Sequence, residues 1–314
     1  MSQPLILLLD KNHPLIVDQL LAAGFKVEED YTSSYEEIRL KIHLYKGIIL
    51  RSRIPIDQQI LKAAKKLKFV ARVGAGMENI DIETATALGI NLINSPEGNR
   101  DSVAEHVLGM LLILMNRLFI ASEQVKRGIW LREENRGDEL MGKTFGIIGY
   151  GNMGKAVAKR LAGFGVKKVI FYDILPGLGD EYAQQVDLET LQQEADIISL
   201  HTPQTPKTHY LIDEAFIQDM KKNFYLVNTA RGKNVNTAAL VRGLKSGKVK
   251  AACLDVLEYE NASFENVQAI ENKDLNYLLD SDKVIVTPHI AGWTVQSKIK
   301  LAQFIVNKIL QLNI

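Results

Sequence analysis

The segment FGIIGYGNMGKAVAKRL, residues 145–161, constrains the fold of this chain more than any other segment. It places Gly149, Gly151 and Gly154 in the pattern G-x-G-x-x-G, between an apolar run typical of a strand and an amphipathic run typical of a helix. Gly149 suits a tight turn, Gly151 lets the backbone approach a pyrophosphate, and Gly154 lets helix and strand pack closely. The N-terminus of the helix would face the phosphates. The segment therefore predicts a Rossmann βαβ unit.

An acidic residue follows this motif at the spacing that dinucleotide binding requires. Asp173 ends the next strand-like run, KVIFYD, 19 residues after Gly154. Its carboxylate would accept hydrogen bonds from the adenosine ribose and repel a 2′-phosphate, so NAD(H) is favoured over NADP(H). The alternative is a glycine turn in an α/β domain that binds no nucleotide. We expect the loop residues Tyr150, Asn152 and Met153 to lie at the cofactor together with the three glycines.

Short apolar runs alternate with amphipathic stretches along the chain, which predicts an α/β fold. The strand-like runs are LILLL (5–9), GIIL (47–50), FVARV (69–73), TFGIIG (144–149), KVIFYD (168–173), DIISL (196–200), FYLVN (224–228), AACLDV (251–256) and KVIVT (283–287). Nearly all are continuously apolar, which indicates parallel sheets buried on both faces. A length of 314 residues suits two domains. We expect residues 1–96 plus 290–314 to form one domain and residues 97–289 the other.

Composition excludes several classes of function. The formal net charge is +1 and the sequence pI is about 7.8, so neither a nucleic-acid partner nor an anionic membrane surface is expected. Cys253 is the single cysteine, which excludes an internal disulfide and a Cys-rich metal site and fits a cytoplasmic location. It is expected to be a small core residue. The most apolar stretch, residues 107–115, is far shorter than the ~20 residues of a membrane span.

An NAD-dependent enzyme that transfers a hydride to or from a carbonyl needs two further groups. One is an acid or base at the carbonyl oxygen, and the other is a cation that binds the anionic substrate. His201 and His289 both follow strand-like runs, where ligands of open α/β sheets collect. The other histidines, His13, His43, His106 and His209, are expected to serve surface or packing roles, without an obvious partner. Arg231 follows a strand-like run and suits a carboxylate, because its guanidinium binds in a bidentate way. One of three acids could hold a histidine protonated, and spacing does not choose among Asp255, Glu258 and Glu260.

Two loops near the start of the chain are candidates for binding an anion. Gly74, Ala75 and Gly76 follow a strand-like run, and successive backbone N–H groups there can form an anion nest. Arg51-Ser52-Arg53 ends another run with two cations, for which the alternative is a solvated turn.

Seven stretches together resemble the D-isomer-specific 2-hydroxyacid dehydrogenases, in the order that the family shows. They are RVGAGMENID, NSPEGNRDSVAEH, GIIGYGNMG with Asp173, SLHTPQTPKTHYLI, LVNTARGKNV, CLDVLEYE and TPHIAGWT. The resemblance runs from GIILRSR to the C-terminal helix. It implies two Rossmann-like, doubly wound parallel-sheet domains, with the NAD domain inserted into a flavodoxin-like substrate domain.

The resemblance also implies roles for individual residues. His289 would be the general acid or base, Glu260 would hold it charged, and Arg231 would bind the substrate carboxylate. Gly74, Ala75 and Gly76 would hold the same carboxylate, while Arg51, Ser52 and Arg53 would contact the rest of the substrate. The implied cofactor contacts beyond the glycine loop and Asp173 are His201, Thr202, Pro203, Thr208, Thr229, Ala230, Arg231, Asp255 near the nicotinamide amide, His289 and Gly292.

The Arg51-Ser52-Arg53 loop looks like that of bacterial D-3-phosphoglycerate dehydrogenases, and two cations suit a phosphate. The expected reaction is therefore D-3-phosphoglycerate to 3-phosphohydroxypyruvate, in serine biosynthesis. The alternatives are a glycerate/hydroxypyruvate (glyoxylate) reductase and an NADH-sensing corepressor or scaffold. Ala291 and Trp293 stand where the family commonly has Gly and a small residue, and both lie close to His289 in the sequence. No C-terminal regulatory domain is expected.

Homodimerisation through the NAD domains is usual in the family. We expect the contact at the long apolar helix within residues 101–117 and at the loop with Trp130. The expected partners are therefore a second copy of the chain and a small 2-hydroxy or 2-keto acid.

Overall fold

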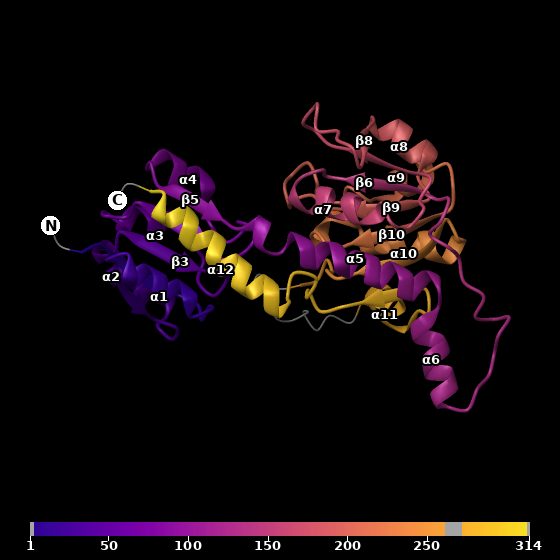
Figure 1. Cartoon of the computed structure of the whole chain (residues 1–314), viewed down its shortest axis with the longest axis horizontal. Helices are drawn as coiled ribbons and strands as arrows, with labels where there is room; N and C mark the ends of the chain where they lie inside the picture. The colour runs from indigo at the N-terminus through magenta and orange to yellow at the C-terminus, as the bar shows by residue number, and fades with distance from the viewer. Residues whose placement is uncertain (1–2, 261–271, 313–314) are drawn as a thin grey trace. The chain divides into compact units, whose positions relative to one another are not determined.

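A computed structural model of the chain describes residues 3–260 and 272–312 and divides into two compact units. Unit 1 comprises Met1–Arg100 and Trp293–Ile314, and unit 2 comprises Asp101–Gly292. The described residues of each unit form one sheet of parallel strands with helices packed on it (Figure 1). The predicted α/β class with two parallel-sheet domains is confirmed. The assignment of substrate to one unit and nucleotide to the other stays a prediction at this point.

Unit 1 contains a five-stranded sheet in the order β2-β1-β3-β4-β5. Its strands are β1 (Leu5–Leu8), β2 (Lys26–Glu29), β3 (Gly47–Leu50), β4 (Phe69–Arg72) and β5 (Asn91–Asn94). Its helices are α1 (Leu15–Ala22), α2 (Tyr35–Lys41), η1 (Ile42–Leu44), α3 (Gln58–Ala63), α4 (Ile82–Ala87), η2 (Pro96–Gly98) and α12 (Val295–Leu310). Alternate strand residues enter two separate apolar clusters, one on each face, as the two-residue period of a strand requires.

The last helix completes the core of unit 1. In Figure 1 α12 lies along the strands of this unit, and its buried Ala302, Ile305 and Val306 join the cluster that contains Ile6 and Ile49. Lys308 Nζ also donates to the Glu97 carboxylate at 2.9 Å. One face of this sheet is therefore covered by residues far from it in sequence.

Unit 2 contains a seven-stranded sheet in the order β12-β11-β10-β9-β6-β7-β8. Its strands are β6 (Thr144–Ile148), β7 (Lys168–Tyr172), β8 (Gln184–Gln185), β9 (Ile197–Leu200), β10 (Phe224–Asn228), β11 (Val249–Leu254) and β12 (Val284–Val286). Its helices are α5 (Arg100–Met115), α6 (Leu118–Lys126), α7 (Asn152–Leu161), α8 (Leu188–Glu194), α9 (Glu214–Asp219), η3 (Gly232–Asn234), α10 (Thr237–Ser246) and α11 (Lys273–Asp280). The strand order reverses at β6, which lies between β7 and β9, and ligands of open α/β sheets bind at such a switch point.

Two apolar clusters cover the faces of this second sheet. One is built on α5 and α7 and includes Phe145 and Cys253, and the other is built on α8 to α11. Cys253 is buried within β11, as predicted, and burial raises the pKa of its thiol. Since both faces are covered, the polar residues that follow the strands gather at the carboxyl edge of the sheet.

No single helix in the described part of the chain is long and apolar enough to cross a membrane. Only α5 and α6 taken together pass by length and composition, with a bend of 58° between them, and buried core helices pass the same test.

Candidate active site

The glycine loop connects β6 to α7 at the switch point of unit 2. Gly149 has φ +93°, a conformation that glycine adopts without strain, and a Cβ there would lie 2.8 Å from the His201 carbonyl oxygen. A Cβ at Gly154 would overlap the Gly149 carbonyl oxygen. Gly151 differs, because a Cβ there would meet no atom within 4 Å. The open space at Gly151 is the room that a phosphate group needs in order to approach the backbone.

The Asp173 carboxylate lies at the glycine loop and accepts a hydrogen bond from its backbone. Its Oδ2 accepts a hydrogen bond from the Tyr150 amide at 2.7 Å, and its Oδ1 accepts one from the Leu175 amide at 2.9 Å. A carboxylate oxygen can accept two hydrogen bonds, so each oxygen keeps a lone pair for a ribose hydroxyl. The carboxylate therefore fits the predicted ribose contact while fixing the turn after β6.

The side chain of Tyr150 belongs to the core. Its ring is fully buried and stacks on Phe171, with ring centroids 3.8 Å apart, and its hydroxyl donates to Asp180 at 2.8 Å. Burial and that carboxylate raise the pKa of Tyr150. Tyr150 can thus offer a cofactor only its backbone. Asn152 and Met153 lie in the first turn of α7, where helix N–H groups lack intrahelical partners.

Two polar side chains at the ends of β9 and β10 have atoms that are buried without a hydrogen-bond partner in the described part of the chain. They are Nδ1 of His201 and Oγ1 of Thr229. The other ring nitrogen of His201 contacts Ser199 Oγ at 2.9 Å, and burial lowers the pKa of His201 to about 3. Because buried polar atoms are normally hydrogen-bonded, these positions fit a polar ligand at this edge. Together with the open Gly151 and the Asp173 lone pairs, they fit a bound dinucleotide.

The loop after β9 is held by its own hydroxyl groups. Asn234 Nδ2 donates to Thr202 Oγ1 at 2.8 Å, and Thr208 Oγ1 donates to the Pro203 carbonyl at 2.6 Å. The three predicted cofactor residues, Thr202, Pro203 and Thr208, are therefore tied by hydrogen bonds within the loop that contains His201.

Arg231 follows β10 in a tight turn. The Asn228 side chain closes this turn by donating to the Arg231 carbonyl at 2.9 Å and accepting from the Ala230 amide at 3.1 Å. A Cβ at the next residue, Gly232, would overlap the backbone carbonyl of Leu257. The turn that carries Arg231 therefore packs directly on the segment that follows β11.

Of the three acidic candidates, Glu260 is the one that contacts the His289 ring. His289 Nδ1 lies 2.8 Å from Glu260 Oε2, and Glu260 Oε1 accepts from the Leu257 amide at 2.5 Å. Both side chains are largely buried, with 24% of His289 and 12% of Glu260 exposed. The packed chain from Gly232 through Leu257 to Glu260 links the turn of Arg231 to His289. The structure thus brings together the elements that carry the predicted catalytic residues.

The other two acidic candidates have different partners. Glu258 accepts from the Tyr210 hydroxyl at 2.5 Å and from the Thr237 amide at 3.0 Å. Asp255 is buried, and its carboxylate accepts from the Ile290 and Ala291 amides, each at 2.8 Å. Its Oδ1 also accepts from the Thr287 hydroxyl at 2.5 Å. Only Glu260 has a hydrogen bond to the His289 ring among these three.

His106 was missed by the sequence reasoning. Its Nε2 lies 3.1 Å from Thr287 Oγ1 and 3.6 Å from Asp255 Oδ1, so the expectation that it has no evident polar partner is wrong. The signal was its place in NSPEGNRDSVAEH, which follows Ser102 by one helical turn and so shares a helix face with it.

The two arginines of the predicted substrate loop, both in unit 1, have different surroundings. Arg53 donates to three backbone carbonyls, those of Leu9, Asp30 and Ser33, at 2.6–2.8 Å. Arg51 instead stacks its guanidinium on the Trp293 ring, 4.1 Å from the centroid. Ser52 is half-buried between them. Arg53 therefore braces its own unit, and its contact with substrate stays a prediction.

In the predicted anion nest of unit 1, two of the three backbone amides could still donate to an anion. The Gly74 amide donates to the Arg72 carbonyl at 2.9 Å. The Asn94 side chain donates to the Ala75 carbonyl at 2.7 Å and fixes that peptide. The amides of Ala75 and Gly76 have no partner in the part of the chain that the structure describes. They remain available to an anion.

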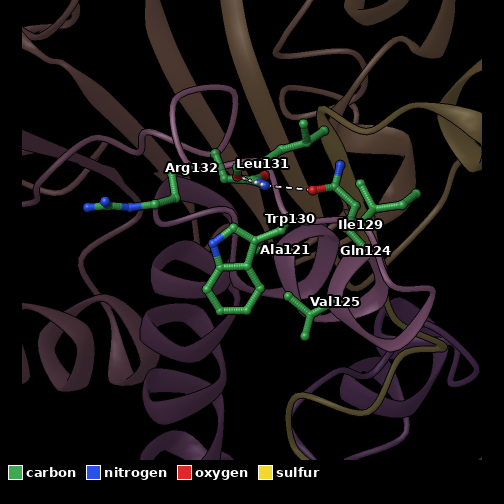
Figure 2. Close-up of a pocket in the computed structure, with 8 residues that line it drawn as sticks. Ala121, Gln124, Val125, Ile129, Trp130, Leu131 and Arg132 are labelled. Atoms are coloured by element: carbon green, nitrogen blue, oxygen red, sulfur yellow. Dashed lines mark hydrogen bonds between the residues drawn. The ribbon is translucent and has the colours of Figure 1, made fainter.

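A small apolar hollow of about 150 Å³ lies between α6 and the loop after it, in unit 2. Figure 2 shows Trp130 over the helix beside Ala121 and Val125, and the dashed hydrogen bond from the Asn135 side chain to Gln124 measures 2.6 Å. Large apolar side chains that line it are exposed, with Val125 at 52% and Trp130 at 75%. The residues around this hollow, 121–135, are separate in sequence from the site residues that follow the strands of unit 2.

Known proteins resemble the chain over most of its length. Residues 108–291 match the family model described as D-isomer specific 2-hydroxyacid dehydrogenase, NAD binding domain. The chain is 38% identical over 301 residues to a D-3-phosphoglycerate dehydrogenase of Archaeoglobus fulgidus, covering 94% of this chain and 55% of that protein. It is also 38% identical to a hydroxypyruvate reductase of Thermotoga maritima, covering 95% of each.

A solved structure with a similar fold is the D-lactate dehydrogenase of Aquifex aeolicus in complex with NAD and lactic acid. The TM-score is 0.84 and the sequence identity 30%, covering 98% of this chain and 94% of that one. The chain spans about half the length of the D-3-phosphoglycerate dehydrogenases that it matches, and nearly all of the hydroxypyruvate reductase.

Proposed function

Because the chain belongs to the D-isomer-specific 2-hydroxyacid dehydrogenases, we propose that it interconverts a D-2-hydroxy acid and its 2-keto acid with NAD(H). The observation that carries the proposal is the 2.8 Å contact of His289 with Glu260, on the same sheet that carries the glycine loop. When bound, NAD(H) supplies or accepts the hydride. The protein must then move one proton and hold one anion.

His289 moves the proton in this proposal. During reduction its imidazolium gives a proton to the oxygen of the keto group, and during oxidation the neutral ring takes the proton back. Glu260 accepts a hydrogen bond from Nδ1, so the proton exchanged with substrate is the one on Nε2. The carboxylate also fixes the orientation of the imidazole ring.

Arg231 holds the substrate carboxylate and polarises the keto oxygen. Its guanidinium suits this role because it binds a carboxylate through two parallel hydrogen bonds. Support comes from the turn that carries it, which packs on Leu257 next to Glu260. The amides of Ala75 and Gly76 are proposed to bind the same carboxylate.

For the rest of the substrate, we propose 3-phosphohydroxypyruvate and D-3-phosphoglycerate as the first pair. Arg51 is the group that would meet the phosphate, and its backbone is fixed by the Asp10 carboxylate, which accepts from the Arg51 amide at 2.6 Å. Stacking on Trp293 fixes the plane of the Arg51 guanidinium.

Hydroxypyruvate is the second candidate, and two observations favour it. A relative of which this chain covers 95% is named a hydroxypyruvate reductase. In addition, Arg53 is engaged by three carbonyl groups, which leaves the phosphate dependent on Arg51.

We also propose that two copies associate through unit 2 at the exposed apolar surface of α6 and Trp130. Apolar side chains exposed together mark an association surface more often than scattered ones do. The cytoplasmic location inferred from cysteine usage stays a prediction.

The test compares initial rates of NADH oxidation with 3-phosphohydroxypyruvate and with hydroxypyruvate at matched concentrations. A kcat/KM at least tenfold higher for the phosphorylated acid, about 1.4 kcal/mol, supports the first pair. The reverse preference supports the second candidate. His289→Ala should lower kcat at least ~100-fold while NADH still binds, as measured by fluorescence. Retention of most activity would show that His289 is not the proton carrier.

A further inference from the structure

We propose that Tyr210 is a positioning residue that ties the loop 201–210 to the turn 257–260 through a hydrogen bond to Glu258. The loop 201–210 follows β9 and carries predicted cofactor contacts, and we call it the cofactor loop. The turn 257–260 follows β11 and carries Glu260. The proposed reaction uses neither of the two tied side chains. The inference rests on the proposed function in one respect, namely that Glu260 orients the proton carrier.

The backbone of Tyr210 lies in a strained conformation. Its φ is +51°, in the left-handed region that bulky L side chains rarely adopt. An aromatic residue in this region raises the free energy of the folded chain, and the conformation persists only where surrounding contacts fix it. The contacts of Tyr210 therefore decide the shape of the cofactor loop at this end.

Two hydrogen bonds restrain Tyr210, one at its backbone and one at its hydroxyl. The amide donates to the Lys233 carbonyl at 2.8 Å, in the turn after β10. The hydroxyl donates to Glu258 Oε1 at 2.5 Å, and a bond of this length to a carboxylate is charge-assisted and stronger than a neutral one. The same bond raises the pKa of Tyr210 to about 12, so the hydroxyl keeps its proton and stays a donor. The side chain thus reaches from the loop after β9 to the turn after β11.

In the cofactor loop, a displacement of Tyr210 would reach residues that are predicted to contact NAD(H). The His209 amide donates to the Thr205 carbonyl at 3.0 Å, and Thr208 Oγ1 donates to the Pro203 carbonyl at 2.6 Å. These bonds close the loop on itself, so that its residues move together. Tyr210 therefore anchors one end of this closed loop.

In the turn after β11, Glu258 lies two residues before Glu260. The Glu260 amide donates to the Leu257 carbonyl at 3.2 Å, and the Leu257 amide donates to Glu260 Oε1 at 2.5 Å, so the turn is closed on itself as well. The second carboxylate oxygen of Glu258 accepts from the Thr237 amide at 3.0 Å, at the start of α10. Glu258 is thus fixed between α10 and Tyr210, and it fixes the turn that carries Glu260.

The bond between Tyr210 and Glu258 therefore joins two closed loops into one rigid element. Loss of either side chain should loosen both loops, including the loop that was not substituted. A side chain that stabilised only its own loop would loosen that loop alone. The experiments measure this difference.

The first test measures hydrogen–deuterium exchange in the full chain without ligand, because exchange reports local opening. Tyr210→Phe removes only the hydroxyl and should accelerate exchange of the Leu257 and Glu260 amides at least threefold. Glu258→Ala should accelerate exchange of the His209 amide at least threefold, although that amide lies in the other loop. Unchanged exchange at these three amides in both variants would overturn the proposal.

Tyr259→Phe is the matched control for the first test. It also removes one hydroxyl from the turn 257–260, but the Tyr259 hydroxyl oxygen accepts from the Asn272 side chain at 2.7 Å, at the start of α11. Exchange of the His209 amide in this variant should stay within twofold of the wild-type rate. An acceleration equal to that in Glu258→Ala would indicate general loosening and would contradict a specific tie.

The second test uses NADH binding and turnover. Tyr210→Phe and Glu258→Ala should each raise the Kd for NADH at least threefold by fluorescence titration. The double variant should bind NADH no more than twofold more weakly than Glu258→Ala, because both substitutions break the same bond. Each single variant should also lower kcat for the better of hydroxypyruvate and 3-phosphohydroxypyruvate at least threefold, because Glu260 loses its fixed position.

Two outcomes of the second test have distinct meanings. Losses in NADH binding that multiply in full in the double variant would show that the two side chains act independently, and would overturn the proposal. If the wild-type chain reduces neither 2-keto acid, the proposed function fails, while amide exchange and NADH binding still decide the role of Tyr210.

Discussion

At the scale of single residues, Arg51 and Arg53 lie in the same loop but have different contacts. The Arg53 guanidinium donates hydrogen bonds to three backbone carbonyls, whereas the Arg51 guanidinium stacks on the Trp293 ring. We predict that Arg51→Met raises KM for 3-phosphohydroxypyruvate at least tenfold more than KM for hydroxypyruvate, because it removes a charge-assisted bond. Arg53→Met should instead lower the free energy of unfolding by about 2 kcal/mol, since carbonyl groups lose their donors. Steady-state kinetics and urea unfolding check the two effects, and an equal KM change with both substrates would contradict the phosphate role of Arg51.

His201 gives a pH dependence of stability. Burial lowers its pKa from 6.5 to about 3, so between these values the unfolded chain binds a proton that the folded chain does not. The free energy of unfolding is therefore highest above pH 6.5 and falls by up to about 1.4 kcal/mol per pH unit as the pH drops towards 3. His201→Gln should remove this contribution. Urea unfolding without ligand at pH 7 and pH 5 measures it, with the exposed His43→Gln as control, and identical pH slopes for wild type and His201→Gln would contradict the prediction.

The proposed catalytic residues could be predicted from the sequence only in part. Arg231 and His289 each follow an apolar run, so their place at the carboxyl edge of a sheet was predictable. Asp255, Glu258 and Glu260 all follow the same run, and nothing in their spacing distinguishes a residue that binds the imidazole from one that binds backbone amides. The resemblance to the family singled out Glu260, and its 2.8 Å contact with His289 agrees with that choice.

At the scale of elements, the three strands that the sequence did not predict all lie at sheet edges, whereas the apolar edge strand β12 was predicted. β2 has the sequence KVEE, β5 has NLIN and β8 has QQ, and each lies at an edge of its sheet. Edge strands carry charged and polar side chains, which remove the apolar run used to predict a strand. The interior strands keep continuous apolar runs because helices cover both faces.

The turn after β10 is the element on which the arrangement of the site depends. Gly232→Ala would push a methyl group into the Leu257 carbonyl and separate the turn of Arg231 from the segment of Glu260. We predict a loss of about 1–3 kcal/mol in the free energy of unfolding and at least tenfold in kcat/KM. Gly109→Ala in α5 is the control, because a Cβ there meets no atom within 4 Å. It should stabilise the chain by up to about 1 kcal/mol. Equal stability of the two variants, by urea unfolding, would contradict the assignment.

At the scale of the whole molecule, the two tryptophans allow a test of self-association. Both are exposed, Trp130 at 75% beside α6 and Trp293 at 64% in unit 1. Trp130→Ser should raise the dimer dissociation constant at least tenfold, because burying a large apolar side chain stabilises an interface by about 1.5–3 kcal/mol. Trp293→Ser should leave it unchanged. Analytical ultracentrifugation over a range of concentrations measures both constants, and a monomeric wild type or equal effects would contradict the proposed interface.

The position of α12 has a consequence for synthesis on the ribosome. Ile305 and Val306 cover the same sheet face as Ile6 and Ile49, yet about two hundred residues of unit 2 are translated between them. At synthesis rates of about 5–20 residues per second, that face waits for roughly 10–40 s before its covering helix exists. The inserted unit can complete its own sheet during this interval. One face of the N-terminal sheet therefore stays uncovered until the last helix of the chain has been made.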